Sequence, residues 1–294
     1  NVAPLRLSNS LPPEVACWFW GEADFKPNGY KEKLDLFGQQ TSFTLLTASF
    51  RAGRREPLTD PAVFEQVKQA VAYAKTKGIG IVPEFSMWSD LTGFLRAYPD
   101  ELYFVVSLQL VQMAEGGRNE VVIAAQAFSG CPSLNYEPGG RPDIKLPPAR
   151  LLRAYSYELA GGVIKAGSLV DVSPLCRQSV APDGSLTVRV EWQPSLLGKT
   201  VVVLGASPGC LAEIFAPHYN EFQEKILARY AGVGLAGACK DEGGDPAVGL
   251  EKLPWSTYRQ GAYQKATGGR DLLADFLLMR TGEQGREAER QLAI

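Results

Sequence analysis

The sequence predicts an α/β protein: a TIM-type (β/α) barrel, complete or partial, with an inserted antiparallel β domain. Strand and helix patterns alternate through the first part of the chain, which is typical of a parallel sheet with crossover helices. A stretch of short strand patterns without a long helix follows, and the alternating pattern then returns. We therefore expect residues 1–101 to begin the barrel, 102–208 to form the inserted domain and 209–294 to continue the barrel.

Apolar runs predict the first two strands. Residues 15–20, with the sequence VACWFW, are continuously apolar, which is typical of a strand buried on both faces of its sheet. Residues 30–37 carry a helix pattern, and residues 41–50 predict the second strand.

The next helix has clear boundaries. Asp60 and Pro61 supply an N-cap and a proline at the first helical position, and Gly78 stands at the C-terminal end. Between them, apolar residues such as Val63 recur at helical spacing. Residues 79–85 then predict a third short, buried strand.

The inserted domain is predicted from strand patterns that alternate with turn signals. Gly116-Gly117 and Asp183-Gly184 are two such signals. The strand patterns cover residues 102–111, 120–128, 151–157, 168–171, 185–192 and 200–204.

The alternating pattern returns with a helix expected within residues 211–230. Residues 235–239 predict a fourth strand, which ends in Lys240-Asp241-Glu242. Three amphipathic helix patterns follow, at residues 255–265, 272–279 and 283–293.

The number of parallel strands points to a partial barrel. An eight-stranded barrel takes ~250 residues, and fewer than 200 remain here outside the inserted domain. Only four parallel strands are predicted. We therefore expect the first half of a longer barrel, completed by a further segment or a second chain. The alternative is an open four-stranded α/β sheet.

Charge and hydropathy exclude some classes of partner. Thirty Lys and Arg residues against 32 Asp and Glu residues give a net charge of −2, so no basic field exists for nucleic acid or anionic membranes. Every apolar run is shorter than the ~20 residues of a membrane span. The chain opens on Asn1 without a signal peptide. A secreted or periplasmic protein whose signal peptide has been removed would fit this start, and the compartment stays open.

Cysteine and histidine content restricts the chemistry. The five cysteines are scattered without a C-x-x-C pair, which argues against a disulfide framework and a zinc knuckle. His218 is the single histidine, so a multi-histidine metal site is excluded and a Ser-His-Asp triad would depend on this one imidazole. We expect no cofactor and no metal, and we expect His218 to be a packed or exposed helix residue.

Candidate site residues follow the predicted parallel strands. Parallel α/β proteins place their sites at the carboxyl ends of these strands. Carboxylates, a guanidinium and indole rings at such ends are typical of a carbohydrate site, because sugar C–H faces stack on indoles and hydroxyls pair with charged groups. In strand order, the residues are Trp18, Trp20 and Asp24, then Arg51, then Glu84 and Trp88, then Asp241 and Glu242.

Asp241 and Glu242 form the sharpest single feature. Adjacent residues of an extended chain point to opposite sides, so only one of the two faces a cleft fully. A partly desolvated carboxyl there has a raised pKa and can protonate a leaving oxygen. The alternative is that Asp241 caps the next segment while Glu242 is solvated.

The other candidates also have structural alternatives. Arg51 can be a surface charge, and Trp18, Trp20 and Trp88 can be core residues. Glu84 is costly to bury without a partner, so it forms either an ion pair with Arg51 or a substrate contact.

The chain resembles the clan A type of (β/α)8-barrel glycoside hydrolases. The resemblance rests on an aromatic first strand, an arginine after strand two, a β insertion and the phrase LAGACKDE at residues 235–242. This phrase is similar to the strand-four end that carries the acid/base glutamate, which implies that role for Glu242, while Arg51 matches the arginine after strand two. Asp241 departs from the pattern, which has asparagine there. The resemblance covers roughly residues 14–90 and 211–280.

The resemblance implies hydrolysis of O-glycosidic bonds in an oligo- or polysaccharide, with Glu242 as general acid/base. Asp241, Arg51 and Glu84 would position the sugar, the tryptophans would stack on it and Asp24 would contribute to binding. A retaining member also needs a nucleophilic carboxylate on strand seven, and no segment here matches that strand. Two alternatives stay open: a non-catalytic carbohydrate-binding or scaffold protein, and a metal-dependent sugar lyase or isomerase.

Overall fold

The computed structural model describes residues 14–50, 58–85, 91–125, 146–239, 253–288 and 290. The chain divides into two compact units. Of the described residues, 14–50, 58–85, 91–93 and 221–239 form what we call the parallel unit. Residues 94–125, 146–220, 253–288 and 290 form the antiparallel unit.

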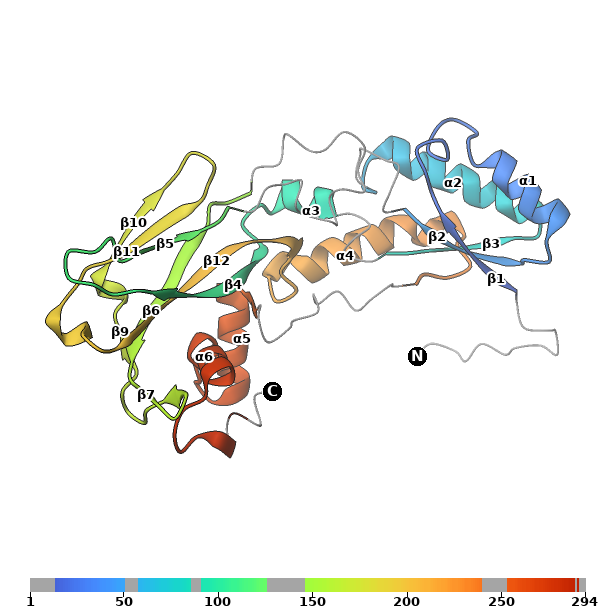
Figure 1. Cartoon of the computed structure of the whole chain (residues 1–294). Helices are drawn as coiled ribbons and strands as arrows, with labels where there is room; N and C mark the ends of the chain where they lie inside the picture. Colours follow the sequence, from blue (N-terminus) through green and yellow to red (C-terminus); the bar gives the residue numbers. More distant parts are fainter. Residues whose placement is uncertain are drawn as a thin grey trace. The chain divides into compact units, whose positions relative to one another are not determined.

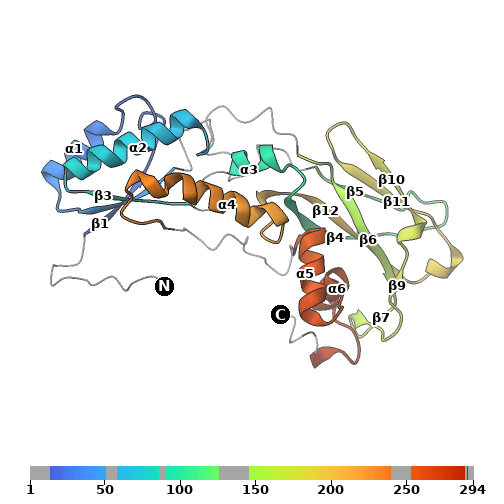
Figure 2. The ribbon, with the colours of Figure 1, turned by 180° about the vertical axis from the view of Figure 1, so that it is seen from behind.

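The parallel unit contains a three-stranded parallel sheet in the order β1-β2-β3. The strands are β1 (Val15–Phe19), β2 (Leu45–Ser49) and β3 (Gly80–Pro83). Helix α1 (Lys31–Gln40) connects β1 to β2, and α2 (Pro61–Thr76) connects β2 to β3. The two helices contact each other and lie side by side in both views (Figures 1 and 2). This arrangement confirms the alternating strand and helix pattern of the first ninety residues.

Helix α2 starts where its sequence predicts. The Asp60 side chain accepts hydrogen bonds from the backbone N–H groups of Ala62 and Val63, which satisfies two of the first free donors of the helix. Gly78 follows the helix with a φ of 75°, a left-handed conformation that suits glycine. The helix packs inward through its buried residues, Val63, Val67, Ala70, Val71 and Ala74.

Strand β1 differs from its prediction of burial on both faces. Trp18 is buried, whereas Val15 and Phe19 are 51% and 59% exposed. The strand lies at one end of the sheet order, and its side chains alternate between a covered and an open face. A continuously apolar sequence therefore does not by itself reveal how many faces of a strand are covered.

The predicted fourth parallel strand is reduced to a single bridge. Cys239 forms a parallel bridge with Glu84, and its backbone N–H donates to the carbonyl of Pro83 at 3.0 Å. The N–H of Phe85 in turn donates to the carbonyl of Cys239 at 3.0 Å. Within the described residues, the chain thus runs beside β3 at this point without forming a regular strand.

The antiparallel unit is built on two sheets. One has five strands in the order β13-β4-β12-β6-β9, and the other has three in the order β10-β11-β5. A two-stranded pair, β7-β8, accompanies them. The strands are β4 (Leu102–Val111), β5 (Glu120–Ile123), β6 (Arg150–Tyr157), β7 (Leu159–Ala160), β8 (Val163–Ile164), β9 (Val170–Asp171), β10 (Cys176–Val180), β11 (Leu186–Val190), β12 (Thr200–Ala212) and β13 (Leu253–Trp255).

The remaining helices are short or of moderate length. Helices α5 (Thr257–Thr267) and α6 (Leu272–Thr281) belong to the antiparallel unit, whereas α3 (Leu91–Ala97) and α4 (Pro217–Tyr230) contain residues of both units. Short 3-10 turns occur at Ser173–Leu175, Pro194–Leu196 and Ala231–Val233. No helix among the described residues is long and apolar enough to cross a membrane.

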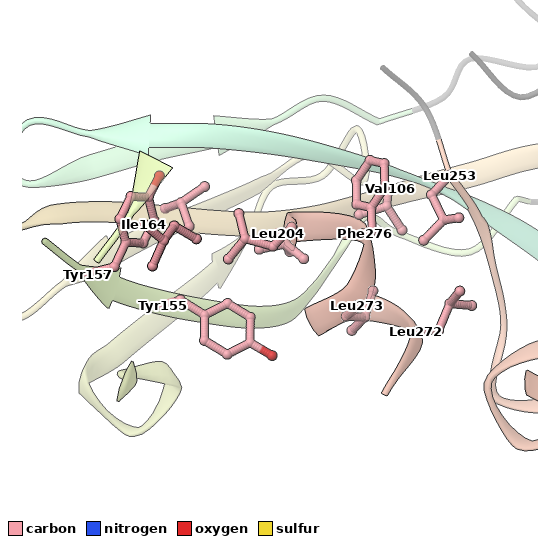
Figure 3. Close-up of a cluster of buried hydrophobic side chains, with 11 residues drawn as sticks. Val106, Tyr155, Tyr157, Ile164, Leu204, Leu253, Leu272, Leu273 and Phe276 are labelled. Atoms are coloured by element: carbon pink, nitrogen blue, oxygen red, sulfur yellow. The ribbon is translucent and has the colours of Figure 1, made fainter. Parts of the chain in front are cut away.

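Strand β12 separates two hydrophobic clusters. Val201 and Val203 belong to the cluster that includes residues of β5 and β11. Val202 and Leu204, which point to the other face, belong to the cluster that includes α6 residues such as Phe276 (Figure 3). The strand is therefore buried on both faces, and each fully buried Val or Leu stabilises the unit by about 1.5–3 kcal/mol.

Strand pairing explains the elements that differ from their predictions in this unit. Strand β12 continues through Ala212, so Leu211 lies in a strand rather than in the predicted helix, and α4 begins at Pro217. Strands β10 and β13 were not predicted. Their partners are β11 and β4, and β4 lies far from β13 in the sequence.

The predicted TIM-type barrel is wrong for the part of the chain that the structure describes. The parallel sheet there is open, with three strands and the bridge at Cys239, and the other sheets are antiparallel. Helix patterns after residue 253 suggested further barrel helices, but α6 covers the five-stranded antiparallel sheet. The open α/β sheet, the alternative that the strand count left, describes the parallel unit better. An amphipathic pattern shows that a helix has a covered face and not which sheet covers it.

Candidate functional site

The candidate site lies at the carboxyl edge of the parallel sheet. Strands β1, β2 and β3 end there, and four of the predicted site residues are described in this region: Trp18, Trp20, Asp24 and Glu84. The other four, Arg51, Trp88, Asp241 and Glu242, lie outside the described residues.

Glu84 is a buried acid at the end of β3. It follows Pro83 directly and is 3% exposed. Its backbone N–H donates to the carbonyl of Ala48 at 2.8 Å, so the β2-β3 ladder continues to this residue. Ser49 of the neighbouring strand is equally buried, at 3% exposure. Burial of a carboxylate is expensive unless the group is paired or hydrogen-bonded.

Glu84 is also next to the segment that leads to the acidic pair. It forms the parallel bridge with Cys239, after which the sequence continues as Lys240-Asp241-Glu242. Neighbouring parallel strands bring their carboxyl ends to the same edge of a sheet. The described backbone therefore ends beside Glu84 at the point where the sequence introduces Asp241 and Glu242.

Asp24 is buried and connects the end of β1 to α1. Its carboxylate is fully buried, and Oδ2 accepts hydrogen bonds from the Gly21 backbone N–H and from Lys33 Nζ, both at 2.7 Å. Oδ1 has no hydrogen-bond partner among the described residues. The contacts of Oδ2 hold the turn after β1 in place, while Oδ1 remains an acceptor that a polar group can use.

Trp18 and Trp20 lie in an aromatic cluster. They are 3% and 1% exposed, and their ring centroids are 5.0 Å apart. Trp20 also makes edge contacts with Phe25 at 4.9 Å and with Phe50 at 4.8 Å. Such contacts stabilise the end of β1 through burial and ring packing. The indole N–H groups of both tryptophans are buried without a hydrogen-bond partner among the described residues.

The two rings leave little surface for a sugar in this conformation, because each is almost completely covered by its neighbours. Their predicted role in stacking stays a prediction, as do the roles of the other site residues. No three His, Cys, Asp or Glu side chains within the described ranges gather closely enough to hold a metal ion.

Comparisons with known proteins give little. No family model matches the chain, and no curated protein matches its sequence. Among solved structures it is similar to a rhamnosidase from Novosphingobium sp. PP1Y, with 12% sequence identity and a TM-score of 0.37. The alignment covers 89% of this chain and 41% of that protein, so the chain spans less than half of the rhamnosidase. The likeness is weak, and it establishes neither a shared fold nor a shared family.

A pair of residues that sequence reasoning missed lies in the antiparallel unit. His218 Nδ1 is 2.5 Å from Glu101 Oε1, and the His218 backbone N–H donates to the other carboxylate oxygen at 3.2 Å. The ring of Tyr98 stacks on the imidazole with centroids 4.3 Å apart. When Nδ1 carries the proton, Nε2 is left as an acceptor.

The same contacts have a structural role. His218 is the second residue of α4, so the Glu101 carboxylate satisfies one of the free N–H groups at the start of the helix. The two residues are 117 positions apart, and no local spacing could have revealed the pair. His218 is a helix residue, as predicted; its ring is stacked on one face, and its side chain is 43% exposed.

Proposed function

We propose that this chain contributes to a glycoside hydrolase that cleaves O-glycosidic bonds in an oligo- or polysaccharide, with Glu242 as the general acid/base. The observation that supports it is the position of Glu84, buried at the carboxyl edge of the parallel sheet and bridged to Cys239. Glu242 follows Cys239 by three positions, a length of chain that spans at most ~11 Å. In this proposal, Glu84 and Glu242 act at the same edge of the sheet.

The proposed chemistry needs one protonated and one ionised carboxyl group. Neighbouring carboxyl groups disfavour each other's ionisation, which favours a protonated acid at the working pH. In the proposed reaction, Glu242 donates its proton to the glycosidic oxygen as the bond to the anomeric carbon breaks. It then takes a proton from the water that adds to that carbon, so the acid is restored.

The remaining site residues have supporting roles in this proposal. Asp241 and Arg51 hold sugar hydroxyls, and Glu84 positions the substrate or the acid. Trp88 stacks on a sugar ring. Trp18, Trp20 and Asp24 shape the end of β1 beside the proposed site.

The test compares Glu242→Gln with the unchanged full chain in assays of sugar release from polysaccharides and aryl glycosides. We expect the substitution to lower kcat by about 10²–10⁴-fold on polysaccharides, whose leaving oxygen needs a proton. The loss in kcat/KM should be much smaller on dinitrophenyl glycosides, because dinitrophenolate leaves without protonation. Glu65→Gln on α2, where the carboxylate is half exposed and contacts Lys68, is the matched control.

The outcomes separate the alternatives. Equal losses on both substrate types, or no loss on either, would remove Glu242 from the acid role. An unchanged chain that binds polysaccharide without releasing sugar would overturn hydrolysis and favour the non-catalytic carbohydrate-binding protein.

A further inference from the structure

We propose that a cavity in the antiparallel unit is a binding site for a neutral sugar unit, separate from the proposed catalytic edge. The cavity has a volume of about 330 Å³, which lies at the lower end of the range for small-ligand pockets. Its polar and aromatic lining consists of Arg150, Arg153, Trp255, Gln260, Gln264 and Asp271.

The cavity is formed by regular elements of one unit. Arg150 and Arg153 come from β6, and Trp255 from β13, which pairs with β4. Gln260 and Gln264 come from α5, one turn apart on the same face of the helix. Leu273 of α6 lines the cavity and belongs to the hydrophobic cluster of Figure 3, so the apolar part of the site is anchored in the core.

Two of the polar residues are held in place by hydrogen bonds to each other and to α6. Gln260 Nε2 donates to Asp271 Oδ2 at 3.3 Å, and Gln260 Oε1 accepts the Leu272 backbone N–H at 3.2 Å. Asp271 Oδ1 caps α6 by accepting the N–H groups of Leu273 and Ala274, both at 2.9 Å. The polar wall is therefore preorganised, which lowers the entropic cost of binding a ligand.

Other polar groups remain available to a ligand. The side chain of Gln264 is exposed and makes no hydrogen bond within the described part of the chain. The indole N–H of Trp255 also has no hydrogen-bond partner among the described residues, although this atom is buried. Arg150 packs its guanidinium 4.0 Å from the centroid of the Phe104 ring. This cation–π packing limits the motion of the guanidinium of a residue that lines the cavity.

The charges favour a neutral ligand over an anion. Arg153 Nε lies 3.8 Å from Asp171 Oδ2, and Asp100 interacts electrostatically with Arg150. Asp271 adds a further negative charge to the lining. Each guanidinium is thus accompanied by an acid, so the site offers hydrogen-bond donors without a strong positive field.

This combination matches the chemistry of a sugar ring. An indole covers the C–H face of a pyranose, while planar amide and guanidinium groups donate to its hydroxyl and ring oxygens. None of the proposed catalytic residues lines the cavity. The inference therefore does not rest on the proposed hydrolysis.

The test measures binding of neutral oligosaccharides to the full chain by titration calorimetry. A panel of gluco-, manno-, galacto- and xylo-oligosaccharides is used, with the Glu242→Gln substitution present in every sample so that turnover does not interfere. We expect at least one neutral oligosaccharide to bind and Trp255→Ala to weaken that binding at least tenfold. Gln264→Ala should weaken it at least threefold. Trp192→Ala, a partly buried tryptophan of the same unit outside the cavity, should leave it unchanged.

Trp255→Ala also removes packing from the core, so its fold is checked by circular dichroism. Gln264→Ala and Arg153→Ala, which change exposed side chains, keep the test decisive if Trp255→Ala does not fold. Binding that all of these cavity variants leave unchanged would overturn the site, as would a panel in which nothing binds. Tighter binding of oligogalacturonate, an anion, than of neutral oligosaccharides would overturn the proposal that the ligand is neutral. If the unchanged chain does not hydrolyse polysaccharides but oligosaccharide binding depends on Trp255, only the proposed function is contradicted.

Discussion

The two units differ in how completely they bury their apolar strands and the partners of their buried acids. Strands β1 and β12 are similarly apolar in sequence, yet β1 leaves Val15 and Phe19 about half exposed while residues 201–204 of β12 are completely buried. Each unit also buries one acid fully, Asp24 in the parallel unit and Glu213 in the antiparallel unit. The partner of Asp24, Lys33, is 45% exposed, whereas the partner of Glu213, Arg259, is 13% exposed.

From this difference we expect the burial of a residue to determine its contribution to the free energy of unfolding more than its residue type does. The antiparallel unit covers its central strand from two sides, by a second sheet and by α6. The parallel unit covers its sheet with α1 and α2 and keeps part of β1 at the surface. Equivalent substitutions in the two units should therefore have unequal effects.

The largest effect is expected for Glu213→Ala. Two nitrogens of the Arg259 guanidinium lie 3.3 Å from the Glu213 carboxylate oxygens, and removal of the acid leaves the guanidinium buried without that partner. We expect the free energy of unfolding to fall by about 3–5 kcal/mol, as measured by urea denaturation. Glu191→Ala, which breaks an exposed pair with Arg177, is the control and should cost less than about 1 kcal/mol. Similar losses of free energy of unfolding for both variants would refute the expected difference between the buried and the exposed ion pair.

The comparison between the two strands is tested by Leu204→Ala in β12 and Phe19→Ala in β1. Leu204 is completely buried, and its truncation should cost about 2–5 kcal/mol through lost burial and a cavity. Phe19 is 59% exposed, so its truncation should cost less than about 1 kcal/mol. Thermal and urea unfolding measure both variants. A loss in the free energy of unfolding above about 1 kcal/mol for Phe19→Ala would mean that another surface covers β1 in solution.

A smaller effect is expected for Asp24→Ala. The substitution removes two hydrogen bonds of 2.7 Å, but Lys33 is partly exposed and its ammonium can return to water. We expect a loss of about 1–3 kcal/mol, measured in the same way. A loss equal to that of Glu213→Ala would show that the exposure of the partner does not set the cost.

The smallest effect concerns the antiparallel unit at alkaline pH. Burial, with a further contribution from the charge of Asp271, raises the pKa of Tyr155 from 10.0 to about 12. The folded state therefore holds this proton when the unfolded state has lost it, and stability falls as the pH rises from about 10 to about 12. Tyr155→Phe should flatten this part of the stability profile in urea denaturation across that range. An unchanged slope would place the group in a more solvated environment.

Local signals predicted much of the secondary structure. The Asp60 cap, Pro61 and the spacing of Val63 and Val67 marked α2 correctly, because capping and helical periodicity depend on neighbours within a few residues. The six predicted antiparallel segments each overlap a strand of the structure. The candidate acids at the ends of β1 and β3 followed from the rule for parallel sheets, and Glu84 indeed lies at that edge.

Only the tertiary structure determined sheet closure, strand burial and the long-range contacts. The chain's apolar runs indicate that strands exist, but sheet closure and the covering of β1 depend on which distant segments pack against it. The same holds for α6, whose apolar residues cover an antiparallel sheet instead of a barrel, and for the Glu101–His218 pair across 117 positions. These contacts are long-range, and their free energies depend on burial and geometry that only the assembled fold supplies.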